Sequence, residues 1–205
     1  NMPLEDVVTI CHRKNVPVLV DAAAERPDSP NVYLEAGADM VAYSGGKCLR
    51  GPQSAGLVLG RKDLLQAAFA NGAPHHSIGR AMKAGKEEIM GLLAAVEKWV
   101  ERDHDAEWRE WENRLDIITN AVSNLPSITT RIQQPGRSNV CPILEIHWEP
   151  KALPITPDEV QHQLSDGDPR IEVFTHENGI EIMPYMMQDG EDVIVAKRLK
   201  EILGK

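Results

Sequence analysis

The sequence predicts an α/β protein in which a partial, parallel-type sheet is followed by a linking long helix and a small α+β domain. Two observations favour this fold class. Near the amino terminus, short continuous apolar runs alternate with segments of helical periodicity, a pattern typical of a parallel sheet covered by helices. After Pro126 the pattern changes to shorter strands, one of them partly alternating in polarity. We therefore expect three segments, at residues 1–85, 86–125 and 126–205.

The first segment contains three predicted helices and three predicted strands. Apolar residues recur at helical spacing directly after Pro3, and a second helical pattern ends at Gly37. The expected helices are residues 4–14, 31–38 and 61–71. The expected buried strands are residues 16–24, 39–44 and 54–60, in which apolar residues follow one another without alternation. Three strands leave apolar sheet edges bare, so we expect partner strands from outside this sequence or from another chain.

The second and third segments are predicted from periodicity and from helix-capping signals. In residues 86–125 apolar residues recur at steps of three and four, which indicates one long helix or a pair of helices. Thr156, Pro157 and Glu159 match a capping box at the start of a helix, and Asp189 is expected to cap the last helix. The expected helices of the small domain are residues 156–167 and 189–204. Its expected strands are residues 128–134, 140–148, 171–176 and 179–184.

Composition excludes several classes of protein. The formal net charge of −9 argues against a nucleic-acid binder, which would carry a basic face. The three cysteines are odd in number and lack C-x-x-C spacing, so we expect neither a disulfide framework nor a metal site. Such cysteine usage fits a reducing compartment, and we expect a cytoplasmic location. No apolar run approaches the ~20 residues that a membrane span requires.

The short sequence Ser44-Gly45-Gly46-Lys47 lies between two predicted strands and admits three interpretations. A phosphate-binding P-loop requires a glycine where Val41 stands and a serine or threonine where Cys48 stands, so that interpretation fails. An acyl-enzyme of the Ser-x-x-Lys type requires a Lys-Thr-Gly element, which the sequence lacks. The third interpretation is a lysine that forms a Schiff base with pyridoxal phosphate.

The third interpretation needs an acid as well as the lysine. Pyridoxal phosphate acts as an electron sink because a carboxylate keeps its ring nitrogen protonated. Asp21 ends a predicted strand, and Lys47 follows a second strand, so both are expected at the carboxyl edge of one parallel sheet. Gly45 and Gly46 are expected to permit close backbone approach and unusual φ. Taken singly, Lys47 could be a surface lysine in a turn and Asp21 a helix cap; their combination favours the cofactor.

Four stretches of the sequence together resemble the fold-type-I pyridoxal-phosphate enzymes. They are "VLVDAAAERP", "GADMVAYSGGKCLRGPQSAGLVLGRKDLL", "IGRAMKAGKEEIMGLLAAVE" and "GDPRIEV…PYMMQDGEDVIVAKRLKEIL". The resemblance is to the branch shared by bacterial selenocysteine synthase and D-glucosaminate-6-phosphate ammonia lyase, and it runs in order along nearly the whole chain. It implies a partial large domain, a linking helix and a small carboxyl-terminal domain.

The resemblance implies roles for individual residues. Lys47 would be the lysine that binds pyridoxal phosphate, Asp21 the partner of its pyridinium nitrogen, and Ser44 a hydroxyl on the side of its phosphate. Other relatives carry a glutamine soon after the aspartate, where this chain has Ala23 and Ala24, so no such role is assigned. Candidates for holding an anionic substrate, each of which could equally be a solvated basic residue, are Arg50, Arg80 and Lys83.

The resemblance also implies a reaction. Selenocysteine synthases carry an acid before the lysine and Gly-Gly-Pro-Gln after it, whereas this chain has Gly46 before Lys47 and continues Cys48-Leu49-Arg50-Gly51-Pro52-Gln53. These departures favour the ammonia-lyase side: a lyase that eliminates ammonia from a phosphorylated 2-amino sugar acid. The alternatives are an aminotransferase, a selenium or sulfur transferase, and a cofactor-free structural relative.

The family's chains are considerably longer than this one. The resemblance therefore leads us to expect the carboxyl-terminal part of an enzyme, which alone would bind cofactor poorly. Enzymes of this fold usually build their sites across a dimer interface, so a homodimer or higher oligomer is expected. The expected partner is a small anionic amino-acid or amino-sugar-acid substrate, with no nucleic acid and no membrane.

Overall fold

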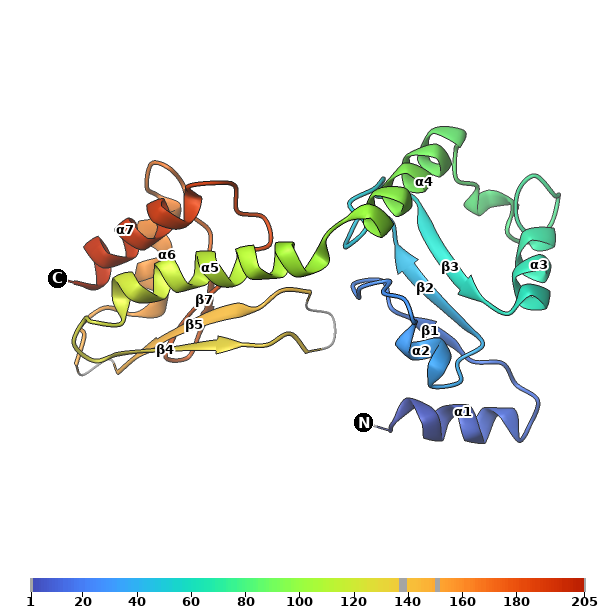
Figure 1. Ribbon diagram of the computed structural model, residues 1–205, viewed down its shortest axis with the longest axis horizontal. Coiled ribbons are helices and arrows are strands. Elements are labelled where there is room, and N and C mark those ends of the chain that lie inside the picture. The colour runs from blue at the N-terminus through green and yellow to red at the C-terminus, as the bar shows by residue number, and fades with distance from the viewer. Residues whose placement is uncertain (1, 137–139, 150–151, 205) are drawn as a thin grey trace. The chain divides into compact units, whose positions relative to one another are not determined.

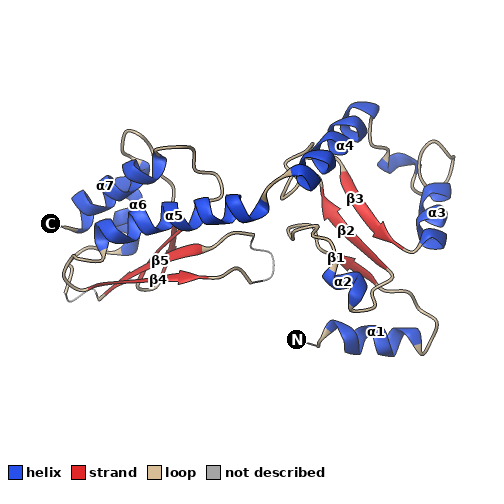
Figure 2. Cartoon of the chain, viewed as in Figure 1, coloured by secondary structure: helices blue, strands red, loops and turns tan. Residues whose placement is uncertain are grey.

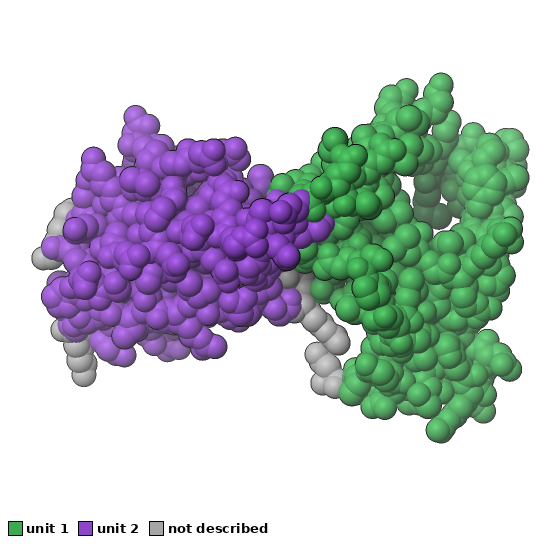
Figure 3. All heavy atoms as spheres, in the orientation of Figure 1, with its two compact units in different colours: residues 1–102 green, residues 103–205 purple. Residues whose placement is uncertain are grey.

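The computed structural model describes residues 2–136, 140–149 and 152–204. The chain divides into two compact units, residues 1–102 and residues 103–205, which Figure 3 shows in different colours. The division lies inside the predicted linking segment 86–125 rather than at its two ends. Among the described residues, no helix has both the length and the apolar character that crossing a membrane requires.

The first unit is built on a three-stranded sheet in the order β1-β2-β3 (Figure 1). Its strands are β1 (Leu19–Asp21), β2 (Met40–Ser44) and β3 (Gly56–Gly60). Its helices are α1 (Leu4–His12), α2 (Val32–Glu35), α3 (Lys62–Asn71) and α4 (Lys86–Glu101), with a 3-10 turn at Arg80–Met82. Every helix and strand expected in residues 4–71 is therefore present, with bounds shifted by a few residues.

The pairing of the strands corrects one expectation. Strands β1 and β2 are parallel, with Asp21 opposite Ala42, but β2 and β3 are antiparallel, with Ser44 opposite Gly56. The α/β fold class is confirmed, and the sheet is mixed rather than parallel-type. The predicted burial of β1 and β3 on both faces was also wrong, because both strands lie at edges of the sheet, and Leu19 and Val58 are exposed within this chain.

The predicted linking helix is two helices. Helix α4 ends at Glu101, Arg102 is extended, and Asp103 caps the next helix, α5 (His104–Val122), by accepting a hydrogen bond from Ala106 N at 2.8 Å. The linking segment is therefore a pair of helices, and the prediction of a single long helix was wrong. The break occurs where an extended residue meets a side chain that satisfies the first free N–H groups of the following helix.

The second unit packs helices against one face of a four-stranded antiparallel sheet (Figure 2). The strand order is β4-β5-β7-β6, formed by β4 (Ile128–Gln133), β5 (Ile143–Trp148), β6 (Phe174–His176) and β7 (Gly179–Ile182). The remaining helices are α6 (Pro157–Ser165) and α7 (Glu191–Leu203). Their apolar faces share one core with the sheet, and fully buried members of it include Leu115, Leu144, Ile146, Leu164 and Leu199.

The caps of α6 and α7 confirm one prediction and correct another. The Thr156 hydroxyl accepts a hydrogen bond from Glu159 N, and the Glu159 carboxylate accepts one from Thr156 N, so the capping box is present. Asp189 does not cap α7. That position is occupied by Gly190 with φ of +86°, and the Asp189 carboxylate instead pairs with Arg114 at 3.0 Å. The left-handed backbone at this turn is a conformation that glycine adopts without a steric penalty.

Asp39, at the amino end of β2, is a buried carboxylate that ties three elements together. It is 5% exposed and accepts hydrogen bonds from Val18 N at 2.7 Å, His12 Nε2 at 2.8 Å and Arg61 Nη1 at 2.7 Å. The hydrogen bond from Val18 N, followed by those from His12 and Arg61, holds the pKa of Asp39 well below its usual range. The network joins α1 and the start of α3 to β2, at the edge of the sheet opposite Lys47.

Replacing Asp39 by asparagine is expected to destabilise the first unit by about 1–3 kcal/mol at neutral pH, the scale for an imperfectly satisfied buried polar group. Because the folded pKa is depressed, the stabilisation is fully present above the unfolded value of about 3.9 and is lost as the pH falls through the folded value. Urea unfolding of the unmodified protein and of the Asp39→Asn variant, at about pH 6 and about pH 3, measures the difference in their free energies of unfolding. An equal difference at both pH values would contradict the assignment to the ionised carboxylate.

Candidate functional site

The predicted cofactor residues lie at one edge of the first unit's sheet. Asp21 is the last residue of β1 and Ser44 the last residue of β2, and because these strands are parallel both end at the same edge. Lys47 follows three residues after Ser44, in the turn that leads away from β2 (Figure 1). The structure therefore brings Asp21, Ser44 and Lys47 to the carboxyl edge, where open α/β sheets bind their ligands.

We call residues 45–53 the lysine loop. It is closed by backbone hydrogen bonds from Gly45 N to Ala55 O at 2.8 Å, from Gly51 N to Gly45 O at 2.7 Å and from Arg50 N to Lys47 O at 2.9 Å. Within the loop, Cys48 and Leu49 are buried, whereas Lys47 is exposed. Among the described residues, the Lys47 amine has no hydrogen-bond or ion-pair partner. Backbone hydrogen bonds thus anchor the loop around Lys47, whose exposed amine pairs with none of the described residues.

Gly45 and Gly46 were expected to allow close backbone approach and an unusual φ, and the structure supports only the first of these. A Cβ on Gly45 would lie 2.7 Å from Ala55 O, closer than real Cβ atoms come, so this glycine is required by the loop's own backbone. Neither Gly45 nor Gly46 has a positive φ, so the expected unusual φ at these two residues is wrong. The left-handed backbone of this loop is instead at Arg50, with φ of +57°, a conformation that is costly for a residue with a Cβ.

We call residues 22–30 the aspartate loop. It begins directly after Asp21, whose Oδ1 accepts a hydrogen bond from Ala23 N at 3.0 Å, and this turn orients the carboxylate. Asp21 Oδ2 has no hydrogen-bond partner within the described part of the chain. Three hydrogen bonds of the described residues join the aspartate loop to the β2 side: Ala22 N donates to Ala42 O at 2.9 Å, Ser44 N to Ala23 O at 3.3 Å, and Cys48 Sγ to Ala24 O at 3.3 Å.

The three candidate substrate-binding residues lie in two different parts of the first unit. Arg50 lies in the lysine loop and is exposed. Arg80 begins the 3-10 turn that Lys83 follows, and the Arg80 Nε is buried without a hydrogen-bond partner within the described residues. No hydrogen bond or ion pair of the described residues joins Arg80 or Lys83 to the lysine loop. Only Arg50 is therefore placed beside Lys47, and roles for Arg80 and Lys83 stay predictions.

The Cys48 thiol is in an environment that disfavours its reactive, ionised form. It is 5% exposed, and burial raises its pKa, although the nearby charge of Arg26 lowers the pKa in part. The thiolate rather than the thiol is the nucleophile, so a buried cysteine with a raised pKa is a weak one. The residue next to Lys47 thus has an anchoring function in the loop.

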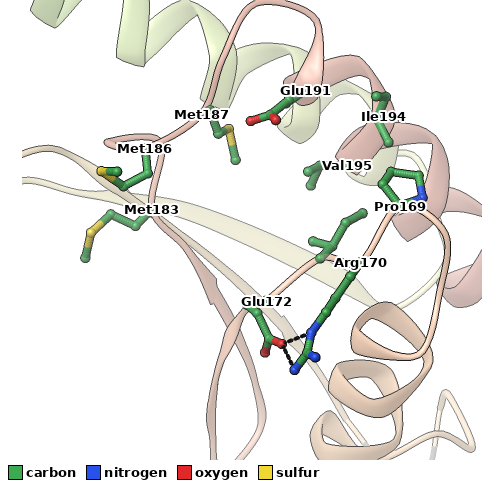
Figure 4. A pocket seen from close by; sticks show the side chains of 10 residues that line it. Pro169, Arg170, Glu172, Met183, Met186, Met187, Glu191, Ile194 and Val195 are labelled. Carbon is green, nitrogen blue, oxygen red and sulfur yellow. Dashed lines mark hydrogen bonds and ion pairs between the residues drawn. The ribbon is translucent and has the colours of Figure 1, made fainter.

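The second unit contains a cavity of about 280 Å³ that includes none of these residues (Figure 4). Met183, Met186 and Met187 line it, and Arg170 and Glu172 form an ion pair at its wall. Its lining is mainly apolar. Among the described residues no group of three or more histidine, cysteine, aspartate or glutamate side chains is arranged to hold a metal ion.

Sequence reasoning missed two residues near the site, Arg26 in the aspartate loop and Trp99 on α4. The Arg26 guanidinium carbon lies 5.3 Å from the centroid of the Trp99 ring. The sequence signal was a lone basic residue in the loop after Asp21, whose partner on α4 is 73 positions distant and could not be foreseen from spacing.

Comparison with known proteins identifies the family of the chain. Residues 1–147 match the family model for aminotransferase class-V. The chain belongs to the aminotransferase class-V family. This family comprises pyridoxal-phosphate-dependent enzymes, and the predicted relationship to fold-type-I enzymes is confirmed.

Individual relatives narrow the comparison without fixing a reaction. The chain is 29% identical over 204 residues to D-glucosaminate-6-phosphate ammonia lyase of Salmonella typhimurium, covering 98% of this chain and 53% of that protein. It is 31% identical to a 5'-C-glycyluridine monooxygenase-decarboxylase of a Streptomyces species, covering 98% of this chain and 50% of the relative. An L-seryl-tRNA(Sec) selenium transferase of Desulfovibrio desulfuricans matches at 30% identity over 49% of this chain and 22% of the transferase.

A solved structure supports the same relationship. A structure of D-glucosaminate-6-phosphate ammonia-lyase superposes with a TM-score of 0.73 at 28% identity, over 99% of this chain and 53% of that one. The chain spans about half the length of the curated relatives that it matches most fully. Both units of the chain therefore have counterparts in an enzyme of this family.

Proposed function

We propose that the protein carrying this chain is a pyridoxal-phosphate-dependent lyase that releases ammonia from a phosphorylated 2-amino sugar acid. The single observation that carries the proposal is the placement of Asp21, Ser44 and Lys47 at one carboxyl edge of the sheet. The relationship to an ammonia lyase over nearly the whole chain supports the choice of reaction.

The three residues fit the cofactor by their chemistry. Lys47 supplies an exposed amine and Asp21 a carboxylate oxygen, neither of which pairs with another described residue, and Ser44 supplies a hydroxyl at the end of β2. Lys47 would hold the cofactor's aldehyde carbon, Asp21 its ring nitrogen, and Ser44 would contribute to binding its phosphate. When bound, pyridoxal phosphate supplies an electron sink for the carbon that bears the substrate's amino group.

The protein's own groups then perform acid–base chemistry. The Lys47 amine accepts the proton from the carbon that bears the amino group. The hydroxyl on the adjacent carbon departs with a proton as water, which leaves an enamine. Addition of water to the tautomeric imine gives a 2-keto acid and ammonia, so the overall reaction balances without an oxidant. Arg50, which lies three residues after Lys47 in the lysine loop, is proposed to attract the anionic substrate.

Two features argue against the alternatives. A sulfur transferase of the desulfurase type needs a mobile, reactive cysteine, whereas Cys48 is buried with a raised pKa. A role on seryl-tRNA would benefit from a basic surface, and the net charge of −9 does not offer one overall. The lyase reaction requires neither feature.

The proposal is tested on the protein encoded by the complete open reading frame that contains this chain. Incubation with pyridoxal phosphate and D-glucosaminate-6-phosphate is expected to release ammonia and a 2-keto acid in equal amounts. The same mixture with an added 2-keto acid acceptor tests for an aminotransferase, which would form a new amino acid. Oxygen uptake with carbon dioxide release and no ammonia would overturn the lyase proposal in favour of the reaction type named for the Streptomyces relative.

A further inference from the structure

One stripe of α4 contacts the lysine loop. Leu92 and Ala95 lie on this stripe, and the loop approaches them so closely that a Cβ on Gly45 would be 3.0 Å from Leu92 Cδ1. A Cβ on Gly51 would be 3.0 Å from Ala95 Cβ. Residues spaced by three and four positions share a face of a helix, so Trp99 continues the stripe that begins at these two residues. Helix α4 therefore presents Trp99 on the same side as its contacts with the lysine loop.

Trp99 receives a cation from the aspartate loop. The Arg26 guanidinium lies over the Trp99 ring at 5.3 Å from its centroid, and Arg26 Nε donates to Asp28 Oδ2 at 3.0 Å. The Trp99 side chain is buried and Arg26 is only 23% exposed, so this cation–π contact is largely withdrawn from water. Arg102 lies over the same ring at 5.4 Å. The Arg26 guanidinium is thus committed to Trp99 and Asp28.

Beyond its first residue the aspartate loop is otherwise joined only weakly to β2 and the lysine loop. Ala22 N donates to Ala42 O of β2 at 2.9 Å, but the next two hydrogen bonds, from Ser44 N to Ala23 O and from the Cys48 thiol to Ala24 O, are both 3.3 Å long. A thiol is a weak donor, and a backbone hydrogen bond of this length is near the long end of the normal range. Contact of both loops with α4 adds a further constraint on the aspartate loop beyond Ala22, and so on how far Asp21 lies from Lys47.

We propose that Arg26 is a positioning residue, which stacks on Trp99 and thereby fixes the Asp21 carboxylate relative to the Lys47 amine. This inference rests on the proposed function, since it concerns the same cofactor site. A cofactor held at its aldehyde carbon by one loop and at its ring nitrogen by the next requires a fixed separation between the two. The pairing of β1 with β2 places the two loops side by side, and helix α4 helps to hold their separation because it contacts both loops along one stripe.

Cofactor binding to the complete protein tests the proposal without relying on activity. Arg26→Met keeps an unbranched side chain but removes the charged guanidinium, and it is expected to raise the dissociation constant for pyridoxal phosphate about 3- to 10-fold. It should also change the circular dichroism of the bound cofactor, which reports cofactor orientation. Arg26→Lys is expected to have a smaller effect. The matched control is Lys98→Met, which removes a cation from the exposed side of α4, where Lys98 pairs with Glu101 at 2.7 Å.

A double-mutant cycle separates positioning from general destabilisation. If Arg26 acts through Trp99, Arg26→Met combined with Trp99→Phe should raise the dissociation constant by less than the product of the two single effects. Independent, multiplying effects would overturn the inference, as would a dissociation constant and dichroism for Arg26→Met equal to those of Lys98→Met. Retention of cofactor absorbance in Lys47→Ala would instead refute the proposed function itself, so the two failures are distinguishable.

Discussion

Replacing Lys47 by alanine is expected to abolish the absorbance band near ~420 nm of the complete protein in pyridoxal phosphate, because that band requires a covalent bond to a lysine amine. Ammonia release should fall to the uncatalysed level, since the same amine is the proposed base. Absorbance spectra before and after dialysis measure the first effect. Borohydride reduction followed by peptide mapping should locate the cofactor on the lysine loop.

The control for this prediction is Lys62→Ala, which removes an exposed lysine from the first residue of α3. Its spectrum should match that of the unmodified protein. A band of equal size in Lys47→Ala would contradict the assignment of the lysine. A protein that never takes up pyridoxal phosphate, and stays colourless before any substitution, would favour the cofactor-free structural relative instead.

Replacing Asp21 by asparagine is expected to lower the rate of ammonia release by about 100- to 1000-fold, the scale on which one preorganised electrostatic partner acts. Asparagine preserves the size of the side chain and an oxygen that can accept from Ala23 N, but it cannot hold a proton on the ring nitrogen. The loss should therefore fall mainly on kcat. Steady-state kinetics at saturating cofactor measures it.

Glu35→Gln, at an exposed position on α2, neutralises a carboxylate of the same unit and is expected to leave kcat unchanged. If Asp21→Asn retained most of its kcat, Asp21 would be no more than the cap of the turn that it forms with Ala23. Melting curves of both variants establish that each is folded before the rates are compared.

The fold was largely predictable because its signals are local. Continuous apolar runs identified the strands of the first unit, and the capping box at Thr156 identified the start of α6. Strand direction was not predictable in the same way. Strand β3 pairs antiparallel to β2 after the chain turns back through the lysine loop. The apolar pattern of Gly56–Gly60 would be the same in a parallel strand and in an antiparallel one.

The candidate site was predictable to the extent that its residues follow strands. Asp21 and Lys47 could be placed at one edge because carboxyl ends of parallel strands coincide. The contact of Arg26 with Trp99 could not, since it depends on how α4 packs against two loops. Asp189 shows the same limit in the second unit: its sequence position suggested a cap, but tertiary pairing with Arg114 gave it a different role.

The buried thiol of Cys48 can serve as a probe of local opening between the aspartate loop and the lysine loop. Cys48 Sγ bonds to Ala24 O across the two loops, so an alkylating reagent can reach the sulfur only while the segments on either side of it are parted. The modification rate at this cysteine would report how often that separation occurs, and slower labelling with a ligand present would show which compounds hold the segments together.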